Sequence, residues 1–195
     1  MNIEYEATFF PVEKDEVRER LRLAGAELVR PEFMQKRVTF KFPEGHDIYG
    51  GWLRVRDEGD KVTMSLKVVD GDTITDQKEI CLTVDSFGEA EKFLLTVGCT
   101  KKAYQETRRE LWRLDGVEIT IDEWPFIEPL VEVEGESETA VRHVSEQLGF
   151  DYSKALFCAV GYLYKLKYGV ALDEINNRTP KITFEMENPF VKNRS

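Results

Sequence analysis

Charged side chains recur at every second position along most of the strand-like segments of this chain. The members of this pattern are Glu4, Glu6, Arg54, Arg56, Lys67, Glu79, Arg109, Asp122, Glu132 and Glu134. Residues two apart on a β-strand point to the same face of the sheet, so each pair can act on one ligand. Paired carboxylates suit a hard ion such as Mg²⁺ or Mn²⁺, and arginine binds phosphate oxygens through its forked guanidinium group. The pattern therefore predicts a site for a polyphosphate complexed with a divalent metal.

The positions between these charges are mostly apolar, as with Leu53 and Val55 or Val131 and Val133. In one interpretation the apolar residues pack against helices, and the charged residues line the inside of a closed barrel. The alternative is an ordinary sheet with one face in water. Glutamate and lysine are poor strand formers, so their repetition in seven strands favours the enclosed interior.

The elements that would position these residues are eight strands and four helices. Strands are expected at 3–10, 35–42, 52–57, 61–69, 73–84, 103–114, 117–123 and 130–134. Helices are expected at 13–24, 85–97, 137–148 and 153–168, with Asp85 and Ser137 as N-terminal caps of two of them. Antiparallel strands with this alternation predict an α+β fold, in which a closed antiparallel eight-stranded β-barrel is flanked by helices.

A chain of 195 residues fits one domain with an appendage. We expect the barrel domain to span residues 1–168, because the chain becomes polar after Gly169. Residues 169–195 then form a C-terminal extension, in which 179–184 is interpreted as a late strand or an extended arm.

Composition narrows the class of partner. The net charge of −10 argues against nucleic acid or an anionic membrane as a ligand, and no apolar run approaches the length of a membrane span. The N-terminus carries two glutamates and lacks the basic region of a signal peptide. Three separated cysteines without a CxxC motif predict reduced thiols and a cytoplasmic location. The two isolated histidines favour oxygen ligands over a histidine-rich metal site.

The order and spacing of the charged motifs resemble those of the CYTH domain family, which contains class IV adenylyl cyclases and thiamine triphosphatases. These proteins are triphosphate tunnel metalloenzymes. The resemblance covers roughly residues 1–168. Its motifs are Glu4-Tyr5-Glu6, Leu53-Arg54-Val55-Arg56, Lys67, Glu79, Arg109, Asp122 and Glu132-Val133-Glu134.

The resemblance implies an enzyme that acts on a small-molecule triphosphate, namely ATP, thiamine triphosphate or tripolyphosphate. Attack by water would shorten the phosphate chain, whereas attack by the ribose 3′-hydroxyl of ATP would give cyclic AMP and pyrophosphate. The implied substrate-binding residues are Arg37, Arg54, Arg56, Lys67, Glu79 and Arg109. The implied catalytic residues are Glu4, Glu6, Lys67 and Arg109. The implied ligands of Mg²⁺ or Mn²⁺ are Glu4, Glu6, Asp122, Glu132 and Glu134.

Three positions depart from the family pattern. Thr8, Gln77 and Thr107 stand where the family carries cations, and Arg37 is a candidate to compensate. These departures keep two other functions open. One is a catalytically silent module that binds a nucleotide or polyphosphate, and the other is a structural or interaction barrel with a solvated polar face.

Some remaining features have two interpretations each. Trp52, Trp112 and Trp124 are candidates to stack on a base or to fill the core between barrel and helices. The glycine-rich segment 45–51 is a substrate lid or a plain connection. The apolar run 156–160, which contains Cys158, is interpreted as a homodimer face or as a helix that faces the core.

Overall fold

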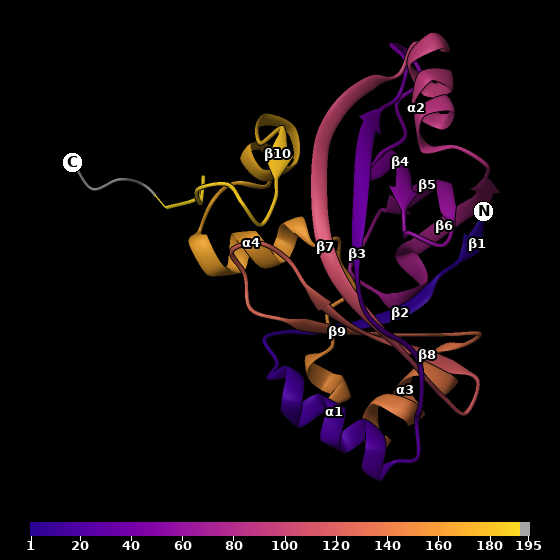
Figure 1. Ribbon diagram of the computed structural model, residues 1–195, viewed down its shortest axis with the longest axis vertical. Helices are drawn as coiled ribbons and strands as arrows, with labels where there is room; N and C mark the ends of the chain where they lie inside the picture. Colours follow the sequence, from indigo (N-terminus) through magenta and orange to yellow (C-terminus); the bar gives the residue numbers. More distant parts are fainter. Residues whose placement is uncertain (192–195) are drawn as a thin grey trace.

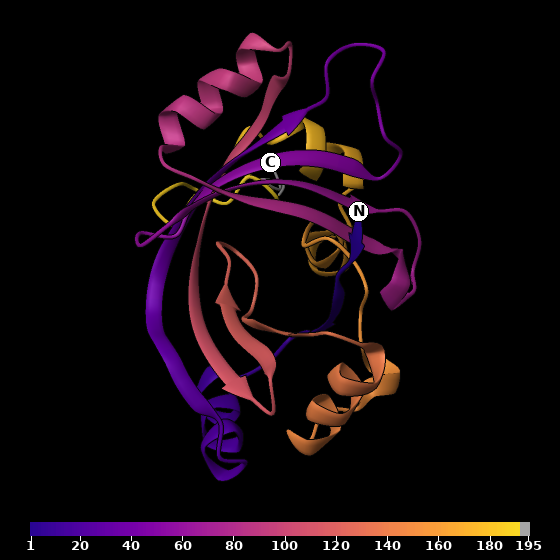
Figure 2. The same ribbon diagram turned by 90° about the vertical axis from the view of Figure 1, so that its right-hand side faces the viewer.

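A strongly curved antiparallel sheet, nearly closed into a barrel, dominates the computed structural model (Figures 1 and 2), which describes residues 1–191. Its strands follow the order β1-β6-β5-β4-β3-β7-β8-β9-β2, and β10 joins β7 outside this path. The bounds are β1 Asn2–Ile3, β2 Tyr5–Phe9, β3 Glu27–Lys41, β4 Gly51–Asp57, β5 Val62–Val69, β6 Gln77–Val84, β7 Thr100–Leu114, β8 Val117–Glu123, β9 Leu130–Gly135 and β10 Lys181–Ile182.

The N-terminal segment joins the two ends of the sheet. β1 pairs with β6, with Asn2 opposite Glu79, and β2 pairs with β9, with Glu6 opposite Glu134. Only Glu4 separates β1 from β2. The predicted barrel is therefore confirmed, but the described chain has nine strands in the ring instead of eight, because the first strand is divided at Glu4.

Helices cover the outside of this ring. They are α1 Lys14–Leu23, α2 Phe87–Thr96, α3 Glu138–Gln147 and α4 Gly161–Tyr168. α1 and α3 lie at one end of the molecule and α2 at the other (Figures 1 and 2). Ser137 caps α3 as expected, by accepting a hydrogen bond from the backbone of Ala140, whereas Ser86 and not Asp85 caps α2.

The apolar positions of the strands form the core beneath the helices. Val131 and Val133 of β9 are completely buried, and they belong to one cluster with Leu21 of α1 and Val141 of α3. The intervening Glu132 lies on the opposite face of β9. The structure thus confirms that apolar residues pack outward against helices while charged residues face the barrel interior.

The predicted helix at 153–168 is wrong over its first half. A 3₁₀ turn, Tyr152–Lys154, is followed by an extended segment at 155–160, and α4 begins only at Gly161. Leu156 exchanges two backbone hydrogen bonds with Thr8, at 3.0 and 2.9 Å. Leu156 and Phe157 pack into two different apolar clusters, as successive residues of a strand do. Tertiary pairing with β2 therefore overrides the local helical pattern in this run.

Two other predicted strands differ at their starts. β3 begins at Glu27, eight residues before the expected start at 35, because it pairs with the long strand β7 from Glu27 onward. The expected strand at 73–84 begins instead with a 3₁₀ turn, Ile74–Asp76, and becomes β6 at Gln77. The Asp76 carboxylate closes that turn by accepting hydrogen bonds from the backbone N–H and the hydroxyl of Thr73, at 3.0 and 2.7 Å.

The C-terminal extension packs against the flank of the barrel (Figure 1). It contains a short π-helix, Glu174–Arg178, followed by β10, which pairs in parallel with β7. Ile175, Ile182 and Phe190 share an apolar cluster with Trp124 of the barrel. The late strand expected within 179–184 is thus present as the two residues of β10. None of the helices at 1–191 combines the length and the apolar character that crossing a membrane requires.

Inside the barrel, one arginine joins three neighbouring strands. Arg109 of β7 donates a hydrogen bond from Nε to Asp122 of β8 at 2.7 Å, and one from Nη2 to Glu132 of β9 at 2.6 Å. Asp122 is only 1% exposed. A buried carboxylate that loses its cation is strongly destabilising, so this pairing holds the barrel together as well as lining it.

We expect Arg109→Met to lower the free energy of unfolding by about 3–5 kcal/mol, because it leaves buried Asp122 without a partner. The matched control is Arg113→Met on the same strand, because Arg113 pairs with Glu118 at 3.1 Å where both side chains are about half exposed. That change should cost less than about 1 kcal/mol. Urea denaturation of both variants measures the difference, and equal losses would contradict this role of Arg109.

Leu21 tests the packing of α1 on the barrel. Leu21 is completely buried, whereas Leu23 on the same helix is 79% exposed. Leu21→Ala should destabilise the fold by about 2–5 kcal/mol through the cavity that it leaves. Leu23→Ala should change stability by less than about 0.5 kcal/mol. A shift of similar size in the two denaturation midpoints would show that α1 is not docked in this way.

Candidate functional site

Three carboxylates converge at one side of the barrel interior. Glu4 lies at the break between β1 and β2, while Glu6 and Glu134 are register partners on β2 and β9. One carboxylate oxygen from each lies within 4.8 Å of the other two. Such a group of oxygen ligands matches the preference of Mg²⁺ and Mn²⁺.

The electrostatics of this cluster favour a bound cation. Burial raises the pKa of Glu4 to about 7, and the nearby carboxylates of Glu79 and Glu134 act in the same direction. Burial, together with the charge of Glu132, also raises the pKa of Glu6 well above its ordinary value. Carboxylates that repel one another in this way are stabilised by a cation placed between them, so the donor set fits a divalent ion.

Lys67 of β5 is a cation in direct contact with this carboxylate cluster. Its ammonium group lies 2.9 Å from one oxygen of Glu4 and 2.8 Å from the other. Burial alone would lower the pKa of Lys67, but the charges of Glu4 and Glu6 raise it above its ordinary value. Lys67 therefore stays protonated and stands beside the carboxylate cluster.

Two buried arginines form the cationic wall of the interior. Arg54 of β4 donates a hydrogen bond to Glu79 at 3.0 Å, and Arg37 of β3 donates one to Gln35 at 2.9 Å. Arg37 also lies over the ring of Trp124, 4.5 Å from its centroid. The Nε–H groups of both arginines are buried and have no hydrogen-bond partner among residues 1–191. A buried donor without a partner is costly, so both groups are suited to an incoming acceptor.

Arg37 is close to other guanidinium groups. Burial, with the charges of Arg56 and Arg54, lowers the pKa of Arg37 well below its ordinary value. Arg56 faces the interior but is held by Glu58, which accepts its Nε–H at 2.9 Å. Burial and the charge of Arg54 lower the pKa of Arg56 to about 10. An anion near these arginines would relieve their mutual repulsion.

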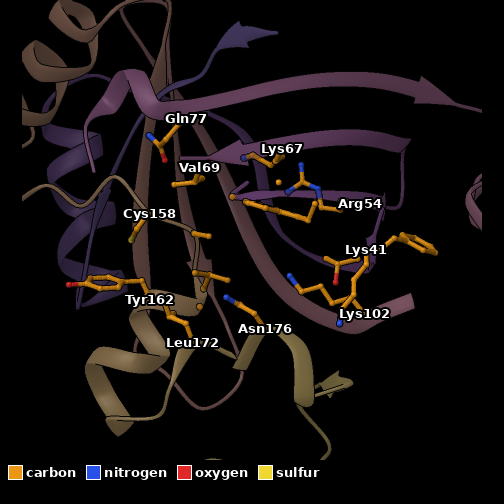
Figure 3. Close-up of a pocket in the computed structure, with 18 of the residues that line it drawn as sticks. Lys41, Arg54, Lys67, Val69, Gln77, Lys102, Cys158, Tyr162, Leu172 and Asn176 are labelled. Carbon is orange, nitrogen blue, oxygen red and sulfur yellow. The ribbon is translucent and has the colours of Figure 1, made fainter. Parts of the chain in front are cut away.

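Part of this charged interior opens into a cavity of about 610 Å³ (Figure 3), whose lining includes Glu6 of the carboxylate cluster but not Glu4 or Glu134, and Arg37 and Arg54 but not Arg56. Its inner part is lined by Glu6, Arg37, Arg54, Lys67 and Glu132, all of them expected site residues. Its outer part is bordered by the connection between β3 and β4, by the extended segment with Cys158, and by the C-terminal extension. The polar strand faces therefore enclose a cavity, which rules out the interpretation of an ordinary solvated sheet face.

The structure does not bring every expected metal ligand into the carboxylate cluster. Asp122 forms its hydrogen bonds with Arg109 instead, and Glu132 binds Arg109 while lining the cavity. Both residues remain within the charged interior: Asp122 is buried there, and the charge of Glu132 raises the pKa of Glu6. Arg109 is thus held by two carboxylates and has less freedom than Arg54 to contact a ligand.

The three uncharged residues that stand at expected cation positions each form hydrogen bonds within the barrel. Gln77 donates a hydrogen bond to the backbone oxygen of Glu6 at 2.7 Å, and Thr107 accepts one from Arg37. Thr8 is 3% exposed and pairs through its backbone with Leu156. The guanidinium group of Arg37 beside Thr107 supplies a positive charge close to where the cation is missing, as the sequence suggested.

Several lining residues were not anticipated. Lys41, Lys102 and Asn176 border the outer part of the cavity. Strand alternation beyond Arg37 is a signal that points to Lys41, but no sequence signal places the extension against the barrel. Trp112 and Trp124 are both buried in the core. Trp124 also lines the cavity, as does the half-buried Trp52.

Solved structures with the same fold include proteins from archaea, bacteria and plants. A conserved hypothetical protein of Pyrococcus furiosus is 20% identical, with a TM-score of 0.66, over 80% of this chain and 96% of that one. A candidate adenylate cyclase of Vibrio parahaemolyticus is 11% identical, with a TM-score of 0.71, over 83% and 97%. A candidate adenylyl cyclase of Hippeastrum, described as having a dominant triphosphatase activity, is 13% identical, with a TM-score of 0.59, over 87% and 99%.

No curated protein matches the chain in sequence. The CYTH domain model, by contrast, matches residues 2–159, which is most of the chain and includes every charged strand of the interior. The match ends just before α4, so α4 and the C-terminal extension lie outside it. With this match, and with the barrel and its charged interior, the chain belongs to the CYTH domain family.

Proposed function

We propose that this protein is a divalent-metal-dependent enzyme that converts a triphosphate inside its barrel. The observation that supports this proposal best is that a cluster of carboxylates and a set of arginine donors face the same barrel interior. Glu4, Glu6 and Glu134 converge on one side, while Arg37 and Arg54 present buried Nε–H groups without partners. A phosphate chain with its metal is neutralised by both sides at once.

Arg54, Arg37 and Lys67 would hold the phosphate chain. The two guanidinium groups donate charge-assisted hydrogen bonds to phosphate oxygens, and Lys67 contributes a point charge beside the carboxylates. Arg56 and Arg109 support the positive potential while they remain bound to their own carboxylates. This arrangement fixes a flexible phosphate chain in one orientation, which is the main requirement for phosphoryl transfer.

Glu4, Glu6 and Glu134 would hold Mg²⁺ or Mn²⁺, and Glu132 lies close enough to influence them electrostatically. When bound, such an ion supplies charge neutralisation on the phosphate oxygens and lowers the pKa of a coordinated hydroxyl. The protein's own contribution is to place the phosphate chain between this cluster and the arginines. Attack by water would yield a shortened phosphate chain and orthophosphate. Attack by the ribose 3′-hydroxyl of ATP would yield cyclic AMP and pyrophosphate.

A second candidate is a module that binds triphosphates without turnover. It is favoured by Gln77 and Thr107, which stand at expected cation positions and are engaged in internal hydrogen bonds. Because missing cations weaken charge stabilisation in a transition state more than ground-state binding, such a site can bind and fail to catalyse.

A substrate panel separates these functions. ATP, thiamine triphosphate and tripolyphosphate would each be incubated with Mg²⁺ and with Mn²⁺, and the products separated by chromatography. Thermal shifts are recorded in parallel, because a ligand at about 100 times its Kd adds about 2.7 kcal/mol of stability. Turnover supports the enzyme, a shift without products supports the silent module, and neither result would reject both.

We expect Glu134→Ala to reduce metal-dependent turnover by about 100-fold or more with little loss of folding stability. The reason is that it removes one of three oxygen ligands, and metal-assisted charge stabilisation is worth several kcal/mol. Glu136→Ala is the matched control, because Glu136 is exposed and lies outside the cluster. Steady-state rates with the best substrate measure the effect. Normal turnover of the Glu134 variant would remove this residue from the site.

Arg54→Met should weaken binding of tripolyphosphate by about 2–3 kcal/mol, through loss of a charge-assisted hydrogen bond. That corresponds to about 30- to 150-fold in Kd. Isothermal titration calorimetry with Mg²⁺ measures the change, and Arg113→Met serves as the control for altered net charge. If both variants bound tripolyphosphate as the wild type does, Arg54 would not be a phosphate ligand.

A further inference from the structure

The C-terminal extension supplies part of the cavity wall. Leu172, Asn176 and Asn177 line its outer part, although the family match ends at residue 159. Figure 3 shows Leu172 and Asn176 on the side of the pocket that faces Arg54 and Lys67. The site therefore includes side chains that belong to this chain's own extension and not to the matched domain.

Asn176 lies against the start of α4, and its side-chain amide is free to bind a ligand. The start of α4 approaches it closely, since a Cβ atom added to Gly161 would lie 2.5 Å from Asn176 Oδ1. Within residues 1–191 the Asn176 side chain has no hydrogen-bond partner, whereas the amide of neighbouring Asn177 donates to Asp173 at 2.9 Å. An amide offers both a donor and an acceptor, so Asn176 is able to recognise a group with the complementary pair.

The opposite wall continues outward from the arginines along β3 and β4. Trp52 lies two residues before Arg54 on the same face of β4, which corresponds to about 7 Å along the strand. Lys41 lies four residues beyond Arg37, about 13 Å along β3. The register that pairs Phe40 with Leu53 brings Lys41 opposite Trp52. A ligand whose phosphates contact Arg37 and Arg54 would therefore extend toward Trp52.

Two lysines set the charge of this outer part. Lys41 and half-buried Lys102 lie together on one side of the pocket (Figure 3), and neither forms an ion pair within residues 1–191. Burial and the charge of Lys41 lower the pKa of Lys102. Asp47 is the acidic residue that lines this part of the cavity. Two adjacent ammonium groups disfavour a cationic organic group, such as the thiazolium ring of thiamine.

We propose that the outer part of the cavity is the subsite for the base of a nucleoside triphosphate, with Asn176 as the residue that determines specificity. Trp52 offers an aromatic surface on which a flat heterocycle can stack. The Asn176 amide matches the donor and acceptor edge of a nucleobase, as asparagine does with adenine in other contexts. The lysines favour a neutral base over a cationic ring. This inference rests on the proposed function, because it needs a triphosphate bound between the arginines and the carboxylates.

The test compares ATP with tripolyphosphate, which lacks a base. Binding by calorimetry with Mg²⁺ and steady-state turnover are measured for the wild type, for Asn176→Ala and for Arg178→Ala. Arg178 is the matched control, because it lies on the same short helix and pairs with Asp173 in solvent. Asn176→Ala should raise the Kd for ATP about 5- to 10-fold and leave that for tripolyphosphate within twofold. The control should change neither value.

A second variant tests whether the effect of Asn176→Ala on ATP binding comes from the position of the amide and not from a general loss of structure. Gly161→Ala keeps the Asn176 amide but displaces it, so it too should weaken ATP binding selectively. Equal losses for ATP and tripolyphosphate in both variants would overturn the inference. Wild-type binding of tripolyphosphate, with ATP no tighter than thiamine triphosphate, would overturn the inference and leave the proposed function intact. Failure of the wild type to bind any triphosphate would reject both.

Discussion

The structure depends on closure of the sheet through the first nine residues of the chain. Because side chains alternate between the two faces of a strand, closing the ring sends one set of residues into a common interior. The N-terminal segment accomplishes this by pairing with β6 on one side and β9 on the other. Glu4 stands where the segment changes partner, so the residue at the junction is also a member of the carboxylate cluster.

Closure gathers charged side chains of both signs inside the barrel, and the internal ion pairs neutralise only some of them. Arg109 is neutralised by Asp122 and Glu132, and Arg56 is bound by Glu58. Such internal pairs stabilise the barrel, because a buried charge without a partner is unfavourable. Other groups are left incomplete, notably the Nε–H groups of the buried arginines. The division between satisfied and unsatisfied charges distinguishes residues that hold the barrel from residues that are ready for a ligand.

Sequence alone predicted those features that follow from local periodicity. Alternating charges identified the interior face of the strands, and the order of the motifs indicated the family, because both depend only on positions along the chain. The break at 155–160 was missed because the backbone of Leu156 pairs with Thr8, a contact between residues far apart in sequence. Asn176 was missed for the same reason, since no pattern in a polar tail shows where it will pack. Asp122 is expected from its motif to be a metal ligand, and its hydrogen bond with Arg109 was not foreseen because it depends on the register between β7 and β8.

The uncharged residues Gln77 and Thr107 show how a family site can be altered without loss of the barrel. Each occupies a place on the interior face where a cation would add to the repulsion among the arginines, and each instead forms hydrogen bonds with backbone or side-chain neighbours. Arg37 restores a charge on the adjacent strand, with Thr107 and Trp124 against its guanidinium group. Under the proposed function, moving a charge from one strand to the next would shift where a phosphate chain is held while it preserves closure. For that function we expect the position of the phosphates relative to the carboxylates, as well as the total charge, to decide whether this interior catalyses or only binds.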